Sequence, residues 1–331
     1  MRFGLRLIGY AGCARRQLQL ARLGEEAGFD SIWFPHDTFM YNTWVLASAV
    51  AAGTSRIHIG SVGTNPYTTD PSEIATFVST LDELSGGRCI LGLGLHTTEM
   101  VEWLGIKTAG YIERTREATR IVRSLLRGET VTDGGPEFQW SDQCYLRFNP
   151  LRADVPIYIS AFGADYLELA GEIGDGCLPM LTPPESAAYM VSAIRRGAAR
   201  SGRKTGDFVI SGCAWLSLSE TRRAASEVMK KMAAYFGPYL EEPALNSIGL
   251  AVRDFLPLKE LVRAGRLEEA CAKVTEPMLR IGITGTPGDV INRVERLAEA
   301  GINEVNLGGP LGPDPEEAIR LMGAKVIPYF K

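Results

Sequence analysis

Residues 26–35, EAGFDSIWFP, decide the fold of this 331-residue chain because they join the end of one helix to the start of a strand. Gly28 is placed to take the left-handed position that ends an α-helix. The apolar run Ser31–Pro35 then predicts a buried strand. The same junction recurs at residues 172–176 (EIGDG) and 299–303 (EAGIN), each with glycine as its third residue. We therefore expect a helix followed by a strand to repeat along the chain.

Signals of the opposite kind mark where helices begin. Each combines a capping side chain, a proline for the first helical turn and a carboxylate that suits the helix dipole. Four stretches have this form: Asp70-Pro71-Ser72-Glu73, Thr182-Pro183-Pro184-Glu185, Thr286-Pro287-Gly288-Asp289 and Asp314-Pro315-Glu316-Glu317. Between the helical segments lie eight strand-like runs: Phe3–Ile8, Ser31–Pro35, Ile57–Ser61, Cys89–Leu93, Ile157–Ser160, Cys177–Met180, Phe208–Leu216 and Glu304–Leu307.

Eight alternating strands and helices predict right-handed crossovers and a parallel sheet that closes into an α/β (β/α)8 TIM barrel. An open, doubly wound sheet is the competing fold, but the strand count and the absence of a single topological switch favour closure. Such barrels take about 250 residues, so roughly 80 are surplus. We expect one barrel domain over residues 1–331, with insertions at about 128–154 and 237–285 that serve as lids or assembly surfaces.

Composition excludes several classes of protein. The chain is 45% hydrophobic and 22% charged, which is typical of a globular protein. Its net charge is −4 and no Lys/Arg block occurs, so no nucleic-acid partner is expected. The apolar run at Met1–Tyr10 is too short for a membrane span or a signal peptide. Six cysteines occur singly, without a CxxC pair, as in reduced cytoplasmic proteins. The sequence contains no closely spaced pair of histidine or cysteine ligands, so nothing in it indicates a metal site.

The chain has three histidines, and two of them follow predicted strands at their carboxyl ends, where the active site of a barrel lies. His36, followed by Asp37, ends the second strand and could donate a proton or hold a substrate, although an isolated histidine is often structural. His58 falls within the third strand, where a structural role is favoured. His96 follows a glycine-rich stretch, and both readings stay open.

Three stretches rich in small residues also follow strands. Residues 90–96 (ILGLGLH) look like a dinucleotide fingerprint, but Thr97 replaces the third glycine and no ribose-binding acid follows. This loop either contacts a flat ligand or serves packing only. Residues 160–164 (SAFGA) would suit a phosphate at a helix N-terminus, or form an ordinary loop. Residues 60–67 (GSVGTNPY) suggest a bulge or strained peptide aimed at a ligand.

Other catalytic patterns are weak or missing. There is no Gly-x-Ser-x-Gly elbow, P-loop or His-Glu-x-x-His motif. Asp37 and Glu99 follow strands and leave paired-carboxylate chemistry open, but nothing in the sequence brings two acids together. Four aromatic residues stack on a ligand or pack in the core, with the core favoured: Trp33, Trp44, Tyr67 and Trp103.

Taken together, the sequence resembles the bacterial-luciferase-like superfamily, and within it the coenzyme F420-dependent methylenetetrahydromethanopterin reductases and their bacterial relatives. The matching stretches occur in the family's order: Glu26–Trp33, Gly60–Tyr67, Glu83–Gly94, Pro156–Gly176 and Ile283–Pro313. The resemblance implies a barrel that binds coenzyme F420, or alternatively FMN, at its carboxyl-terminal face. It further implies a homo-oligomer, dimer or tetramer, and hydride transfer at ring carbon C5 of a deazaflavin.

The resemblance also implies which residues form the site. A non-prolyl cis peptide would fall within Ser61-Val62-Gly63, at the start of a cofactor-binding stretch that continues through Thr64 and Asn65. Gly94-Leu95-His96 would border the cofactor, and Ala161-Phe162-Gly163 would hold its phosphate.

The catalytic candidates depart from the family at two points. Many relatives carry Asp-His where this chain has His36-Asp37, and the archaeal reductases have a glutamate where this chain has Arg6. An arginine stays ionised and cannot replace a carboxylic acid. An anionic group on a small-molecule substrate is therefore expected near Arg6.

The leading hypothesis is an F420-dependent oxidoreductase that exchanges a hydride with a C=N, C=C or C=O bond. His36 or His96 would supply the proton, and Arg6 would orient the substrate. An FMN-dependent monooxygenase and a non-catalytic flavin-binding barrel are the alternatives.

Overall fold

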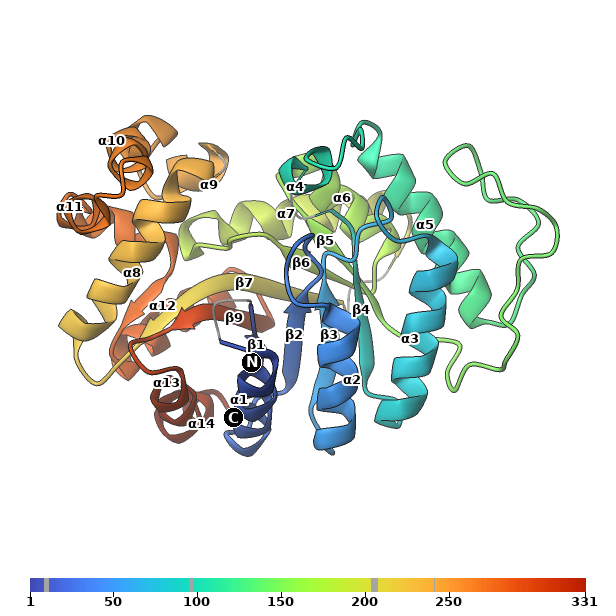
Figure 1. The fold of residues 1–331 in the computed structure, drawn as a ribbon, viewed down its shortest axis with the longest axis horizontal. Helices are drawn as coiled ribbons and strands as arrows, with labels where there is room; N and C mark the ends of the chain where they lie inside the picture. The colour runs from blue at the N-terminus through green and yellow to red at the C-terminus, as the bar shows by residue number, and fades with distance from the viewer. Residues whose placement is uncertain (9–11, 96–97, 204–207, 241) are drawn as a thin grey trace. The chain divides into compact units, whose positions relative to one another are not determined.

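The computed structural model describes residues 1–8, 12–95, 98–203, 208–240 and 242–331. Its parallel strands follow the order β6-β5-β4-β3-β2-β1-β9-β7-β8, and β6 also pairs with β7 (Figure 1). The closed sheet and its surrounding helices confirm the predicted (β/α)8 barrel. The strands are β1 Arg2–Arg6, β2 Ser31–Pro35, β3 His58–Val62, β4 Cys89–Leu93, β5 Ile157–Ala161, β6 Gly176–Pro179, β7 Val209–Leu218, β8 Ile283–Gly285 and β9 Glu304–Leu311.

Helices alternate with these strands. They are α1 Ala14–Glu26, α2 Thr43–Gly53, α3 Pro71–Ser85, α4 Glu99–Glu102, α5 Tyr111–Leu126, α6 Gly163–Ile173, α7 Pro184–Arg200, α8 Arg222–Phe236, α9 Glu242–Ser247, α10 Val252–Arg263, α11 Leu267–Ala272, α12 Pro287–Glu299, α13 Pro315–Leu321 and α14 Ile327–Phe330. Short 3-10 turns cover η2 Gly237–Tyr239 and η3 Glu276–Ile281, and a π-helical turn η4 covers Met322–Val326.

The chain forms two compact units. The first, called unit 1, contains Met1–Phe29, Leu181–Val191 and Ser211–Lys331. The second, called unit 2, contains Asp30–Met180 and Ser192–Ile210. Within unit 2, strands β2 to β6 pair in sequence order, and within unit 1, β9 pairs with both β1 and β7.

All eight predicted strands are present, and the structure adds one. The ninth, β8, is three residues long and pairs with the end of β7 at Leu216–Leu218. It was missed because three residues are too few to show an alternating pattern. The last predicted strand begins at Glu304 as expected but continues to Leu311.

The predicted helix stops hold with one exception. Gly28 and Gly301 take left-handed φ angles of 87° and 99°, as predicted for residues that end helices. Gly174, in contrast, has φ −82° and ψ 162°, so its predicted left-handed conformation is wrong. Glycine is required there for space: a Cβ would lie 2.6 Å from the carbonyl oxygen of Gly176.

The predicted capping signals hold at α3, α12 and α13, whereas α7 begins at Pro184, two residues after the predicted cap Thr182. The Asp70 side chain accepts a hydrogen bond from the amide of Ser72 and begins α3. At α12, the Asp289 carboxylate accepts a bond of 2.9 Å from the amide of Thr286. Polar cap residues therefore set these helix starts locally.

The stretch ELSGGR at residues 83–88 builds the amino-terminal end of β4. Gly86 and Gly87 both have positive φ angles, which turn the chain sharply after α3. The Arg88 guanidinium then donates hydrogen bonds to the carbonyl oxygens of Ile57 and Ala51, at 2.8 and 2.9 Å. These bonds give the motif a structural role at the amino-terminal end of the strands, the end of a barrel that serves stability rather than chemistry.

The two expected insertions differ in structure. Residues 128–154 form a long irregular segment between α5 and β5, with one bridge between Val131 and Cys144 (Figure 1). Residues 237–285 hold three helices and share a hydrophobic core with α8 in unit 1, in which Met229, Leu245 and Phe255 are fully buried. This second insertion is therefore packed on α8 through one continuous core.

Candidate functional site

The loop after β3 is tied to the two strands that follow it. Gly63 donates its amide hydrogen to Ser160 Oγ at 2.8 Å, which joins the ends of β3 and β5. Thr64 donates to the carbonyl oxygen of Gly92 at 2.8 Å and accepts from the amide of Gly94 at 2.9 Å. The ends of β3, β4 and β5 are thereby held in one fixed arrangement.

The predicted non-prolyl cis peptide is not found. The peptide bonds of Ser61-Val62-Gly63 are trans, and the cis bond among the described residues is Gly309–Pro310. The turn at the end of β3 is made by a different device, because Gly63 takes a left-handed φ of 70°. Asn65 also proves to be engaged locally: its Oδ1 accepts from the amide of Thr68 at 2.9 Å and stabilises the turn.

Two glycines, Gly92 within β4 and Gly94 just after it, are required by packing. A Cβ on Gly92 would lie 2.0 Å from the carbonyl oxygen of Ser61, and one on Gly94 would lie 2.6 Å from Tyr166 Oη. Gly94 also has φ 133°, a conformation that side chains rarely adopt. The packing interpretation therefore accounts for these glycines, while the predicted contact of Gly94 and Leu95 with a ligand stays a prediction. His96 lies outside the described residues.

Tyr166 on α6 holds the loop at Gly94 and Leu95 by a hydrogen bond. Its hydroxyl accepts a hydrogen bond of 3.0 Å from the Leu95 amide and lies 2.7 Å from Thr115 Oγ1. The side chain is fully buried, and burial raises the pKa of the phenol, which stays protonated. Its ring also contacts Tyr111 and Phe162, with centroids 5.2 and 5.6 Å apart. Sequence reasoning missed this residue because nothing in its local pattern distinguishes it from a helix core residue.

The loop Ala161-Phe162-Gly163 leads directly into α6. Phe162 is the N-cap and makes no side-chain hydrogen bond to the helix, so the first amides of α6 lack a capping side chain. Gly163 has φ 70°, and a Cβ there would meet nothing within 4 Å. An 11-residue helix with an uncapped N-terminus and open space beside it suits an anion. Asp165 opposes this preference, because it is an exposed acid in the first turn.

His36 stands at the end of β2, as expected. Its amide donates to the carbonyl oxygen of Val62 at 2.9 Å, which continues the β2–β3 ladder. Nδ1 of the ring is buried and has no hydrogen-bond partner among the described residues. Burial lowers the pKa of the imidazole below 6.5, so the ring is neutral near pH 7. The adjoining Asp37 accepts a backbone bond from Met40 at 3.4 Å.

Most of the other candidates have structural surroundings. His58 begins β3 at the amino-terminal end, where its Nδ1 lies 3.3 Å from the carbonyl oxygen of Asp30. Trp33 is fully buried, with its ring against Gly60. Tyr67 donates to the carbonyl oxygen of Thr108.

The other two aromatic candidates, Trp44 and Trp103, differ in their surroundings. Trp44 stacks on Phe77 with centroids 5.0 Å apart, whereas Trp103 is 62% exposed. Among the aromatic rings of the described residues, Trp103 contacts only the exposed Phe39 ring, with centroids 6.3 Å apart, so core packing does not explain it.

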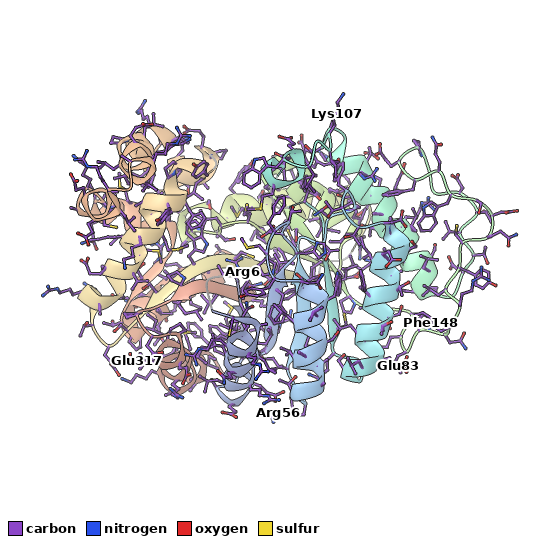
Figure 2. The ribbon with its side chains drawn as sticks, viewed as in Figure 1. Arg6, Arg56, Glu83, Lys107, Phe148 and Glu317 are labelled. Carbon is purple, nitrogen blue, oxygen red and sulfur yellow. The ribbon has the colours of Figure 1, made fainter. Side chains whose placement is uncertain are left out.

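Arg6 belongs to unit 1 and is the last residue of β1 (Figure 2). It is only 8% exposed. Its guanidinium lies against the backbone of Gly308 on β9. Burial raises the pKa of the Cys213 thiol on β7, and the charge of the Arg6 guanidinium opposes that shift. Among the residues that the structure describes, no carboxylate forms an ion pair with Arg6. No group of three metal-ligating side chains was found, and no helix is long and apolar enough to span a membrane, in the part of the chain described here.

Comparisons with known proteins agree on one family. A family model described as luciferase-like monooxygenase matches residues 4–304. The chain is 32% identical over 317 residues to a 5,10-methylenetetrahydromethanopterin reductase from Archaeoglobus fulgidus, with 94% of each chain covered. It is 25% identical over 345 residues to an F420-dependent glucose-6-phosphate dehydrogenase from Microbacterium testaceum, covering 100% of this chain and 98% of that protein.

A solved structure is similar along the whole chain. The coenzyme F420-dependent tetrahydromethanopterin reductase from Methanopyrus kandleri superposes with a TM-score of 0.93 at 27% sequence identity. The match covers 100% of this chain and 99% of the other. Fold and sequence therefore point to the same group of proteins.

Proposed function

This chain belongs to the luciferase-like monooxygenase family, and within that family we propose that it is an F420-dependent oxidoreductase. It exchanges a hydride between the deazaflavin and a small or pterin-like organic substrate, in the manner of a methylenetetrahydromethanopterin reductase. The observation that carries this proposal is the similarity over 94% of the chain to a methylenetetrahydromethanopterin reductase. The solved F420-dependent reductase, at TM-score 0.93, supports it independently.

One feature of unit 2 fits the phosphate group of such a cofactor. The uncapped N-terminus of α6, with Gly163 facing open space, would hold the phosphate through backbone amides. Ala161 and Phe162 complete this loop.

The ring would lie against the two glycine loops, Ser61 to Asn65 and Gly94 to His96. The bond from Gly63 to Ser160 holds the first loop, and the bond from Leu95 to Tyr166 holds the described part of the second, Gly94 and Leu95. A rigid support favours binding because less conformational entropy is lost.

Bound F420 supplies a two-electron hydride carrier, and the protein supplies position and proton control. The neutral imidazole of His36 suits a proton acceptor when substrate is oxidised, because its pKa lies below 6.5. When the substrate is instead reduced, the His36 imidazole first takes up a proton from solvent and then donates it to the substrate. Asp37 and His96 are secondary candidates for the same task, and Arg6 orients a charged part of the substrate.

An FMN-dependent monooxygenase is the alternative within the family. F420 alone carries a lactyl-oligoglutamate tail, so the cofactor itself discriminates the two. The similarity to F420-dependent proteins favours the deazaflavin. A non-catalytic flavin-binding barrel would bind a cofactor tightly without turnover.

Binding of purified protein to F420 and, separately, to FMN tests the function. We expect micromolar or tighter binding of F420, followed by F420-dependent turnover with a reduced or oxidised pterin. Preference for FMN would favour the monooxygenase. Tight F420 binding without turnover across a substrate panel would favour the non-catalytic barrel.

Several broader proposals accompany this function. The protein forms a homo-oligomer, either dimer or tetramer, which sedimentation can measure. It is cytoplasmic, in keeping with six cysteines that form no disulfide bond within the described part of the chain. Residues 1–331 form one barrel domain whose insertion at Gly237–Gly285 covers the substrate. A folded deletion variant with unchanged substrate specificity would remove the covering role.

A further inference from the structure

Three strands of unit 1 present a polar face to the barrel interior. Phe3 on β1 contacts Phe330 of the C-terminal helix, with ring centroids 5.6 Å apart, so the alternate residues of β1 point the other way, into the barrel. The register across β1, β9 and β7 aligns these inward residues in three levels: Arg2, Glu304 and Ser211; then Gly4, Asn306 and Cys213; then Arg6, Gly308 and Trp215.

The lowest level is electrically balanced. Glu304 is 2% exposed, and its Oε1 accepts a hydrogen bond of 2.6 Å from Ser211 Oγ. Its Oε2 lies 3.7 Å from Nε of Arg2. This buried carboxylate therefore has its own cation and its own donor, two levels away from Arg6.

The uppermost level holds a buried cation without an acid. Gly308 has no side chain, and this lets the Arg6 guanidinium cross β9: a Cβ on Gly308 would lie 2.5 Å from Nη2 and 2.6 Å from Nε. The charge of the guanidinium acts on the Cys213 thiol on β7, which donates its own hydrogen to the carbonyl oxygen of Ser211 at 3.7 Å and is at most a weak acceptor. A guanidinium carries five N–H donors, so most of its bonding capacity remains unused within the described residues.

The middle level holds an amide with the same property. Asn306 is fully buried, and neither its Nδ2 nor its Oδ1 has a hydrogen-bond partner among the described residues. It pairs in register with Cys213, the thiol on which the charge of the Arg6 guanidinium acts. Buried amides are ordinarily hydrogen bonded, so two adjacent groups with free donors indicate a ligand.

We propose that Arg6 and Asn306 form a subsite for an anionic oxygen group of the substrate, a carboxylate or a phosphate. The guanidinium fork matches such a group in two bonds, and the amide Nδ2 supplies a third donor. Gly308 is the position that makes the subsite possible. The inference rests on the proposed function in one respect: the anion is taken to be part of the substrate and not of F420.

Small anions are the probes for this subsite. Binding of benzoate and of inorganic phosphate is measured by calorimetry on the F420-loaded protein and on the protein alone. The variants are Arg6→Gln, Asn306→Leu and Gly308→Ala, each checked by circular dichroism. Arg15→Gln is the matched control, because Arg15 is an exposed arginine of the same unit that forms no ion pair within the described residues.

We expect the wild type and Arg15→Gln to bind one probe equally. Each subsite variant should bind it about tenfold or more weakly, since a charge-assisted bond is lost or displaced. Benzoate binding alone identifies a carboxylate subsite, and phosphate binding alone a phosphate subsite. Should Arg6→Gln fold poorly, Arg6→Lys keeps the charge without the fork and should give an intermediate loss.

Three outcomes would overturn the subsite. The wild type binds neither probe, Arg6→Gln binds as well as the wild type, or Arg6→Gln loses F420 affinity while keeping the probe. If F420 fails to bind the wild type, the proposed function fails, but the probe titrations still decide the subsite. The two proposals can therefore fail separately.

Discussion

The amide of Gly63 and the hydroxyl of Ser160 are joined by a hydrogen bond of 2.8 Å that spans from β3 to β5. The strand between them, β4, carries Gly92 at this point, and a Cβ there would lie 2.0 Å from the carbonyl oxygen of Ser61. The absence of a side chain on Gly92 therefore lets β3 and β5 keep this arrangement. One bond between residues 97 positions apart thus fixes the loop that we propose supports the cofactor ring.

Ser160→Ala should loosen this loop. The buried Gly63 amide loses its acceptor, so the free energy of unfolding should fall by about 1–3 kcal/mol. F420 should bind more weakly as the loop loses order. Urea denaturation and F420 titration measure both effects. Ser79→Ala is the matched control, since Ser79 Oγ is buried without a hydrogen-bond partner and its loss should cost little. Equal F420 affinity in both variants would contradict the supporting role.

Gly94→Ala should be far more harmful than Gly28→Ala. Both glycines have positive φ, but a Cβ on Gly94 would also strike Tyr166 Oη at 2.6 Å, while one on Gly28 would meet nothing within 4 Å. We expect about 3–5 kcal/mol of destabilisation at Gly94 and about 1–2 at Gly28. Thermal and urea unfolding give the comparison. Similar losses at both positions would show that backbone strain, and not the steric clash, dominates.

Asp165→Asn should strengthen F420 binding. Removing an acid from the first turn of α6 relieves its repulsion of a phosphate at the helix N-terminus. The expected gain is about two- to fivefold in affinity, largest at low salt. Asp142→Asn, an exposed acid on the segment 128–154, serves as control. An affinity that neither changes nor depends on salt would place the phosphate elsewhere.

His36 should make stability depend on pH below neutrality. Burial lowers its pKa below 6.5 in the folded chain, so as pH falls through 6.5 the unfolded chain takes up a proton that the folded chain does not. The free energy of unfolding therefore declines from pH 7 toward the folded pKa, and His36→Gln should flatten that slope.

Urea denaturation from pH 5 to pH 8 measures the slope, with His58→Gln as the control for an exposed histidine. If His36 also accepts the substrate proton, kcat/KM for substrate oxidation should fall at acid pH in the wild type, following the same group. A slope unchanged by His36→Gln would rule out this histidine as its source.

The sequence by itself determined the barrel and most of its junctions. Asp70 and Thr286 begin helices, and Gly28 and Gly301 end them, through interactions within a few residues of the chain. Such local signals are legible because the capping side chain and its target amide are close in sequence. Gly174 shows the limit: a contact with Gly176, and not a left-handed turn, requires it.

Only the tertiary structure decided which predicted site residues support one another. Gly63 meets Ser160, and Leu95 meets Tyr166, across separations that no local pattern encodes. The sequence placed Arg6 in the first predicted strand, but its crossing of Gly308 on β9 depends on strand register. Register is set by the packing of the whole sheet, because a shift of one residue would turn every inward side chain outward.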